Sequence, residues 1–360
     1  MLRYTAVNVN NILTNIAYIL PNDYNRNEDT VILFIPGNPG IIEFYDSFLE
    51  QLYEFCQIPL FGVSYAGHNI AEHESALVNR LARQIFPRIE TNKEKAYTLE
   101  EQINHKVQFI EQYLHKTQNI ILMAHSLGSY MSLSLLQRIS KEYNIVRVIL
   151  LFPVFERTME TTKGKSFVPR FQNFRHSLIR TGHVIENLPN ILRQSIYSIA
   201  EQRYKADNAQ AMKKALKALL TPTCARNIAQ MLDDLSQFGD HSKFSDIFTE
   251  FGERLTLYYG SNDAWTPLAY GQRLSKNYPF VDVRVDEYDI QHCFVLESCF
   301  KLSKIVASLI DLRKIDYTVR VIKVRSQDEN ENLITERSQS SHSFSSHTSE
   351  KDGSLPTICL

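Results

Sequence analysis

The stretch Asn119–Leu136, NIILMAHSLGSYMSLSLL, decides the fold. Its first part is an apolar run, and its second part has the hydrophobic spacing of a helix. A membrane span needs roughly 20 mostly apolar residues. This stretch contains polar side chains that would be costly in hydrocarbon, namely His125, Ser126, Ser129, Ser132 and Ser134. We therefore expect a buried strand, a turn and a helix rather than a membrane span.

A nucleophile elbow is predicted where that strand meets the helix. An apolar strand, a serine flanked by small residues two positions away on each side, and a helix form this pattern. The small residues here are Ala124 and Gly128, and alanine stands where glycine is usual. The turn, which also contains His125 and Leu127, aims the hydroxyl of Ser126 at the helix N-terminus, where the helix dipole favours negative charge. The pattern predicts Ser126 as a nucleophile.

Apolar runs alternate with helical patterns on both sides of this stretch. This alternation predicts an α/β fold with a mostly parallel central sheet and helices on both faces. Thr98 and Glu101 form a capping box at the start of one helix. Residues 1–20 read as one or two edge strands. The further expected strands are 31–36, 145–154, 254–260 and 281–288, and residues 58–68 are expected to form a strand and a loop. The further expected helices are 40–55, 98–116 and 294–314.

The pattern changes after the fourth buried strand. Residues 156–250 show helical patterns and no convincing strand, so we expect a helical cap inserted into a core formed by residues 1–155 and 251–325. Residues 326–360 are polar and rich in serine, which predicts a disordered tail.

Composition excludes several classes of function. The net charge is −1, so the chain lacks the basic excess with which proteins neutralise the phosphates of nucleic acids. The five cysteines show no CxxC spacing, which argues against a disulfide framework or a zinc site and favours a reducing compartment. The N-terminus does not have the pattern of a signal peptide.

A serine nucleophile needs a base, and the base needs an orienting carboxylate. In α/β-hydrolases the chain order is serine, acid, histidine. Asp263 follows the expected strand LTLYY, and His292 lies in the loop before the last expected helix, so both have the required order and placement. The competing residues, which lack this placement, are Asp286, Asp289, His68, His73 and His241. We expect a catalytic triad of Ser126, Asp263 and His292, and this chemistry needs no metal or cofactor.

An oxyanion hole requires two backbone N–H groups aimed at the developing charge. One donor is expected from Leu127, which follows the nucleophile. The other is expected from Asn38 in the loop IPGNPG, because Pro39 has no N–H and Asn38 directly follows Pro36 and Gly37. The rigidity of this loop would hold the donor in place.

Four segments resemble the lipid droplet-associated hydrolases: FIPGNPGIIEFYDSF, AHSLGSYM, YYGSNDAWTP and QHCFV. The resemblance covers residues 28–312, and the family pattern usually has glycine where this chain has Ala124. It implies an α/β-hydrolase whose triad is Ser126, Asp263 and His292. It also implies a lipid ester substrate such as cholesteryl ester, a role in neutral lipid storage or turnover, and a peripheral location at lipid droplets and the cytosolic face of the endoplasmic reticulum.

Residues 163–200 combine basic and apolar side chains, as interfacial helices do. Two interpretations stay open: a cap that only buries its apolar face over the active site, and a cap that also touches a lipid surface. Three functions remain as alternatives: a serine lipid esterase at a lipid surface, a droplet scaffold or tether with weak or no hydrolase activity, and an esterase for small soluble esters.

Overall fold

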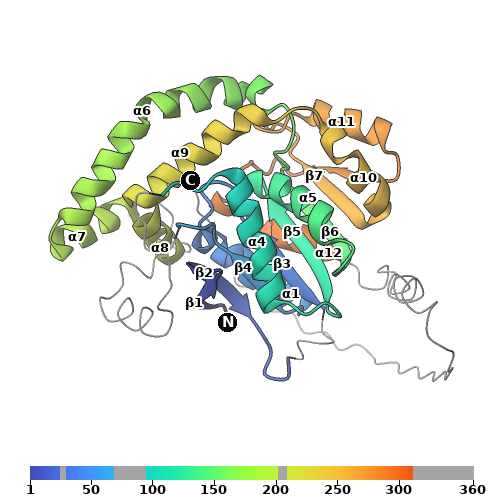
Figure 1. The fold of residues 1–360 in the computed structure, drawn as a ribbon, viewed down its shortest axis with the longest axis horizontal. Helices are drawn as coiled ribbons and strands as arrows, with labels where there is room; N and C mark the ends of the chain where they lie inside the picture. Colours follow the sequence, from blue (N-terminus) through green and yellow to red (C-terminus); the bar gives the residue numbers. More distant parts are fainter. Residues whose placement is uncertain (25–29, 69–94, 202–208, 311–360) are drawn as a thin grey trace.

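The computed structural model describes residues 1–24, 30–68, 95–201 and 209–310, so the predicted tail at 326–360 lies outside the described residues. Eight strands form one sheet in the order β1-β2-β4-β3-β5-β6-β7-β8 (Figure 1). The strands are β1 (Arg3–Val9), β2 (Ile12–Ile19), β3 (Val31–Ile35), β4 (Leu60–Val63), β5 (Asn119–His125), β6 (Asn144–Leu151), β7 (Leu255–Tyr259) and β8 (Asp282–Val285).

The two N-terminal strands differ from the rest of the sheet in direction. β1 pairs antiparallel with β2, and β2 pairs antiparallel with β4, whereas all other neighbours are parallel. Residues 1–20 form two strands, as expected, but only β1 lies at the edge of the sheet, because β2 pairs with β1 and β4. The prediction of a mostly parallel sheet is confirmed as well.

Helices occupy the segments between the parallel strands. The α-helices are α1 (Asp46–Cys56), α4 (Leu99–Tyr113), α5 (Leu127–Ile139), α6 (Thr162–Asn187), α7 (Asn190–Glu201), α8 (Ala209–Leu219), α9 (Pro222–Asp234), α10 (Ser245–Phe251), α11 (Leu268–Asn277) and α12 (Cys299–Leu309). The 3₁₀ helices are η1 (Ile42–Tyr45), η2 (Thr158–Glu160), η4 (Leu235–Gln237), η5 (His241–Phe244), η6 (Gly252–Arg254) and η7 (Phe294–Leu296). The predicted capping box of α4 is present: the Glu101 side chain accepts from the Thr98 N–H at 2.8 Å, and Thr98 accepts from the Glu101 N–H.

The last helix begins later than predicted. The sequence favoured one helix from residue 294, but the structure has the short η7 first and begins α12 only at Cys299. Phe294 is fully buried and packs against Phe48 of α1 with ring centroids 5.0 Å apart. The apolar residue at position 294 is therefore explained by its burial in the core and does not mark the start of the helix.

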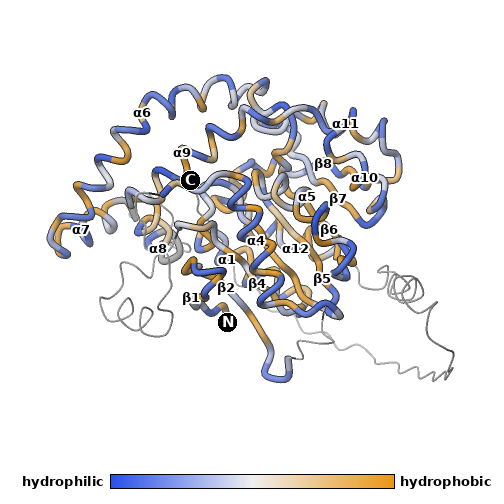
Figure 2. The backbone as a smooth tube through the Cα atoms, viewed as in Figure 1, coloured by the Kyte–Doolittle hydropathy of each residue, from blue (hydrophilic) through white to orange (hydrophobic). Residues whose placement is uncertain are grey.

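The two faces of the sheet are covered by different helices. Phe34 of β3 packs on Phe48 of α1, whereas Phe61 of the neighbouring β4 packs on Phe109 of α4. Phe34 is in register with Gly62, so Phe61 points to the opposite face. The inner strands are buried on both sides, which explains their continuous hydrophobic runs (Figure 2).

The helices α6 to α10 lie between β6 and β7 in the chain, and the described residues from 156 to 250 contain no strand. The predicted helical insertion is therefore present. α6 packs along α9, and α8 packs on η1 of the core (Figure 1). Among the described residues, no helix combines the length and the apolar composition that crossing a bilayer requires.

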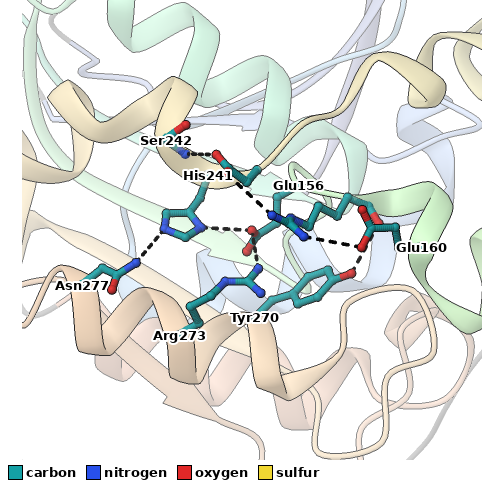
Figure 3. A network of polar contacts seen from close by, with 9 residues as sticks. Glu156, Glu160, His241, Ser242, Tyr270, Arg273 and Asn277 are labelled. Carbon is teal, nitrogen blue, oxygen red and sulfur yellow. Dashed lines mark hydrogen bonds and ion pairs between the residues drawn. The ribbon is translucent and has the colours of Figure 1, made fainter.

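A polar network, in which Glu156 and His241 are buried, links both ends of the insertion to α11 (Figure 3). Glu156, at the start of the insertion, accepts from Arg273 of α11 at 2.7 Å and contacts Nδ1 of His241 at 3.1 Å. His241 begins η5 near the end of the insertion, and its Nε2 lies 3.0 Å from the Asn277 side chain. The side chain of Glu156 is buried and that of Arg273 is partly exposed, and their ion pair links the start of the insertion to α11.

Candidate active site

Ser126 occupies a strained turn between β5 and α5. Its backbone has φ +51° and ψ −124°, a conformation that non-glycine residues rarely adopt. The turn is held at both of its backbone groups: the Ser126 N–H donates to the Leu151 carbonyl at 2.9 Å, and the Ser126 carbonyl accepts from the Val154 N–H at 3.1 Å. Such strain at the end of a parallel strand is the geometry of a nucleophile elbow.

The small residues of the elbow have a steric reason. A Cβ at Gly128 would lie 2.5 Å from the Ile35 carbonyl oxygen and 2.6 Å from that of Pro36, both in the backbone. Ala124 is fully buried and lies in register between Ile35 on β3 and Leu150 on β6. The elbow therefore accommodates a methyl group at position 124 but needs glycine at position 128.

The structure brings the three predicted triad residues together at the carboxyl edge of the sheet. Nε2 of His292 lies 2.9 Å from Oγ of Ser126, and Nδ1 of His292 lies 2.6 Å from Oδ2 of Asp263. The residues come from three separate loops, which follow β5, β7 and β8. Ligands and reactive groups gather at this edge in open α/β sheets because the strand ends present their loops side by side.

Asp263 is held as a charged hydrogen-bond acceptor. It accepts from the Trp265 N–H and from the Thr266 hydroxyl, each at 2.7 Å. Burial raises the pKa of the Asp263 carboxyl, but the facing His292 and these hydrogen bonds outweigh burial and bring its pKa below the ordinary value. An ionised Asp263 accepts the Nδ1–H of His292, which leaves the Nε2 lone pair free to accept the proton of Ser126.

The two expected oxyanion donors lie next to the serine. Asn38, Leu127 and Ser126 line the same cavity. Among the described residues, neither the Asn38 N–H nor the Leu127 N–H donates to a protein acceptor. Tyr65 braces the loop that carries Asn38, because its hydroxyl donates to the Pro36 carbonyl at 2.9 Å.

The site opens into a cavity of about 520 Å³. Part of its wall comes from α6, through Phe167, Phe171 and Leu178, so the cap forms one side of the site. Most of the remaining lining is apolar: Pro39, Phe44, Val154, Leu219, Leu220, Ile228, Leu232, Leu235, Trp265 and Val295. Tyr45, His125, Lys163 and Cys293 also line the cavity. An acyl chain or another apolar group fits such a wall, whereas a strongly hydrated substrate does not.

The competing acids have structural partners elsewhere. Asp286 is buried and accepts from the Tyr258 hydroxyl at 2.6 Å and from the Ile290 N–H at 2.7 Å. Asp289 is exposed and faces the Asn262 side chain at 3.4 Å. Both carboxylates hold the turns that present the site and do not reach Ser126.

The competing bases also lie away from the serine. His68 is buried with its Nδ1 3.8 Å from Sγ of Cys224, and His241 belongs to the polar network with Glu156. His73 lies outside the described residues. Within the described part of the chain, no three His, Cys, Asp or Glu side chains group in a way that could hold a metal ion.

The contact between Tyr45 and His125 was not predicted from the sequence. The sequence places His125 in the elbow and Tyr45 in the segment FIPGNPGIIEFYDSF, without a contact between them. In the structure the Tyr45 hydroxyl lies 2.8 Å from Nδ1 of His125, and both residues line the cavity. Tyr45 lies in one of the segments that resemble the family, which is the only indication of a role that the sequence gives. The sequence alone does not predict that Tyr45 and His125 lie side by side.

The chain is similar to one family over most of its length. A family model described as lipid-droplet associated hydrolase matches residues 28–295. The lipid droplet-associated hydrolase of Mus musculus is 30% identical over 289 residues, which cover 79% of this chain and 85% of the mouse protein. The relative of the same name in Drosophila melanogaster is 30% identical over 314 residues, covering 84% of this chain and 96% of the fly protein.

Solved structures share the fold. The haloalkane dehalogenase DbeA from Bradyrhizobium elkani superposes with a TM-score of 0.57 at 11% identity, covering 86% of this chain and 97% of that chain. A bacterial membrane phospholipase A superposes with a TM-score of 0.55 at 13% identity, covering 87% of each chain. Identities this low show the fold alone, and the predicted α/β-hydrolase fold class is confirmed.

Proposed function

Because the chain belongs to the lipid droplet-associated hydrolase family, we propose that it is a serine hydrolase that cleaves lipid esters at a droplet surface. The observation that carries this proposal is the contact chain from Ser126 through His292 to Asp263, which faces a mostly apolar cavity. The proposed reaction class is carboxylic ester hydrolysis.

The proposed mechanism follows from the contacts. His292 takes the proton of Ser126 as Oγ attacks the ester carbonyl, and the Asn38 and Leu127 N–H groups stabilise the resulting oxyanion. The intermediate collapses to an acyl-serine, and the alcohol leaves with the proton that His292 returns. Water then attacks the acyl-serine with His292 as the base and releases the fatty acid. Asp263 orients His292 in every step.

The cavity supports an apolar substrate. Its walls would cover an acyl chain, and the family name of the relatives points to lipid. We propose a neutral lipid ester, with cholesteryl ester as the first substrate to test, and a role in neutral lipid storage or turnover.

The outer side of the cap supports contact with a lipid surface. Several large apolar side chains of α6 and α7 are exposed, and we call them the cap patch: Phe174, Val184, Ile191, Leu192 and Ile199. Figure 2 shows hydrophobic and hydrophilic residues interspersed along these two helices. Exposed apolar groups with neighbouring arginines suit shallow insertion into an anionic interface. We propose peripheral attachment of residues 163–200 to the droplet monolayer or to the cytosolic face of the endoplasmic reticulum.

Three arginines of α6 differ in their surroundings. Arg175 pairs with Asp233 of α9 at 2.9 Å, so it holds the cap together. Arg170 and Arg180 are exposed on α6 and remain available to headgroups. Phe167 and Phe171 of α6 line the cavity, and Phe174 of the same helix is exposed. One helix can therefore both cover the active site and contact a lipid surface.

A fluorophosphonate probe tests the proposed nucleophile directly. Purified wild type should be labelled, and the Ser126→Ala and His292→Ala variants should not. Ser129→Ala is the matched control, because Ser129 is a buried serine in the first turn of α5, the helix that begins after Ser126. This variant should be labelled like wild type. Absence of labelling in wild type, with and without a lipid emulsion, contradicts the proposal and favours the alternative of a droplet scaffold or tether with weak or no hydrolase activity.

A further inference from the structure

A chain of hydrogen bonds runs beside the triad and joins three separate loops. The Gly37 N–H donates to the Tyr45 hydroxyl at 2.9 Å. The same hydroxyl lies 2.8 Å from Nδ1 of His125, and Nε2 of His125 lies 2.9 Å from the His292 carbonyl oxygen. Gly37 precedes Asn38, so the chain connects the oxyanion loop, the elbow and the loop of the proposed base.

The direction of each bond follows from donor and acceptor chemistry. A carbonyl oxygen only accepts, so Nε2 of His125 must carry the hydrogen that it donates to His292. In a neutral imidazole Nδ1 is then the acceptor, and the Tyr45 hydroxyl donates to it. The Tyr45 hydroxyl donates its one hydrogen to His125 and accepts the Gly37 N–H with its oxygen, so the two contacts are compatible.

The surroundings keep this arrangement in its neutral form. Burial and the neighbouring His292 hold the pKa of the His125 imidazole well below its ordinary value. Phe152 and Phe294 pack edge-on against the His125 ring, with centroids 6.1 Å and 5.0 Å away. At neutral pH the ring is therefore uncharged and has one preferred tautomer.

We propose that Tyr45 and His125 are positioning residues of the active site. The His292 carbonyl requires hydrogen on Nε2 of His125, and the Tyr45 hydroxyl donates to the remaining Nδ1 and fixes the rotation of the ring. His125 thereby holds the backbone of His292 where the His292 ring meets Ser126. Through Gly37, the same hydroxyl fixes the loop that carries the Asn38 N–H. The inference rests on the proposed function, because it assigns a role in the reaction of the same site.

The proposal predicts a change in turnover rather than in binding. Both side chains line the cavity, but their polar atoms are bonded to protein groups, and both set the place of groups that meet the substrate. Displacing a reacting group by about 1 Å costs about 100-fold in rate. We therefore expect kcat to fall while KM changes little.

Two substitutions of His125 separate its two contacts. In His125→Gln the amide nitrogen reaches about as far as Nε2 and still donates to the His292 carbonyl, so kcat should stay within about threefold of wild type. In His125→Asn the shorter side chain keeps an acceptor for Tyr45 but loses the donor to His292, so kcat should fall by about 100-fold. Equal kcat values for wild type and His125→Asn would overturn the proposal.

Tyr45→Phe removes the hydroxyl and keeps the ring. It should lower kcat by about tenfold with KM nearly unchanged, since the His125 ring loses the hydrogen bond that fixes its rotation. Tyr113→Phe is the matched control, because it removes a 2.9 Å hydrogen bond from the Tyr113 hydroxyl to the Asn8 carbonyl, far from the site, and should leave kcat unchanged.

The tautomer of His125 is measurable without any assay of activity. Long-range ¹H–¹⁵N correlations of wild type at neutral pH should show hydrogen on Nε2 of His125, assigned by its loss in His125→Gln. In Tyr45→Phe the Nδ1 chemical shift should move, because that nitrogen loses its hydrogen bond. Hydrogen on Nδ1 in wild type, or an Nδ1 shift that is unchanged in Tyr45→Phe, would refute the arrangement. If wild type neither binds the fluorophosphonate nor turns over an ester, the proposed function fails, while the spectrum still decides whether Tyr45 donates to Nδ1 of His125.

Discussion

Gly37 and Ser126 approach each other so closely that a Cβ at position 37 would lie 2.8 Å from the Ser126 Cβ. The same Cβ would lie 3.0 Å from Nδ1 of His125. Gly37→Ala must therefore move the oxyanion loop or the elbow. We expect kcat/KM for a soluble ester to fall about 100-fold, because a displacement of about 1 Å has that effect, while the circular dichroism spectrum stays unchanged.

Gly239→Ala is the control for this prediction. No atom lies within 4 Å of a Cβ built at Gly239. This variant should keep the activity of wild type. If Gly37→Ala is as active as Gly239→Ala, the close contact with Ser126 has no bearing on the reaction.

The geometry of the elbow was accessible from the sequence because its causes are local. An apolar strand, small residues two positions from Ser126 and a following helix are all read within one short segment. Asp263 and His292 were found from chain order and from their positions after strands. The structure supplied the reason for Gly128, which lies against the carbonyls of β3 and its following loop.

Other parts of the site depend on packing that one sequence does not encode locally. Tyr45 and His125 are 80 positions apart, and only the folded sheet places their side chains in contact. Similarly, the apolar spacing after Cys293 suggested a helix, but burial of Phe294 against the core delays α12 to Cys299. Hydrophobic periodicity indicates which side chains are buried, whereas tertiary packing determines where the helix begins.

Asp263→Asn should abolish most of the turnover. The amide is neutral and can donate to His292, which favours the tautomer whose Nε2 no longer accepts the proton of Ser126. A fall in kcat of about 10⁴-fold at neutral pH is expected, on the scale seen for such a change in serine proteases. Asp289→Asn serves as the comparison, since Asp289 is exposed and has φ +55°, where asparagine is well tolerated. A comparable loss of kcat in both variants would argue against Asp263 as the orienting acid.

Asp46 should make the stability of the fold depend on pH. Burial raises the pKa of its carboxyl from 3.8 to about 7, and Lys214 of α8, 3.2 Å away, opposes part of this shift. Between these two values the folded chain holds a proton that the unfolded chain has lost. By linkage, this group's contribution to stability is fully present below pH 3.8 and falls as the pH rises to about 7.

The Asp46→Asn variant isolates this effect. Its side chain does not titrate, so its Tm should fall less than that of wild type between pH 5 and pH 7.5, roughly the upper part of the window that linkage defines. Lys214→Met should extend the fall in Tm to higher pH, because it removes the charge that lowers the pKa of Asp46. Equal slopes of Tm against pH in wild type and Asp46→Asn would contradict the assignment.

The cap patch predicts where the protein meets a lipid surface. Ile191 is 80% exposed and Ile199 is 61% exposed, both on α7, whereas Phe280 is 73% exposed at the opposite end of the fold, just before β8. Burying one such side chain in an apolar phase is worth about 1.5–3 kcal/mol. The double variant Ile191→Glu with Ile199→Glu should therefore reduce binding to phospholipid-coated triolein droplets by at least about tenfold, measured by flotation. Phe280→Glu should float like wild type, and both proteins should hydrolyse a soluble ester at the wild-type rate. Normal flotation of the double variant would place the lipid contact away from α7, and loss of flotation in Phe280→Glu alone would place it beside β8.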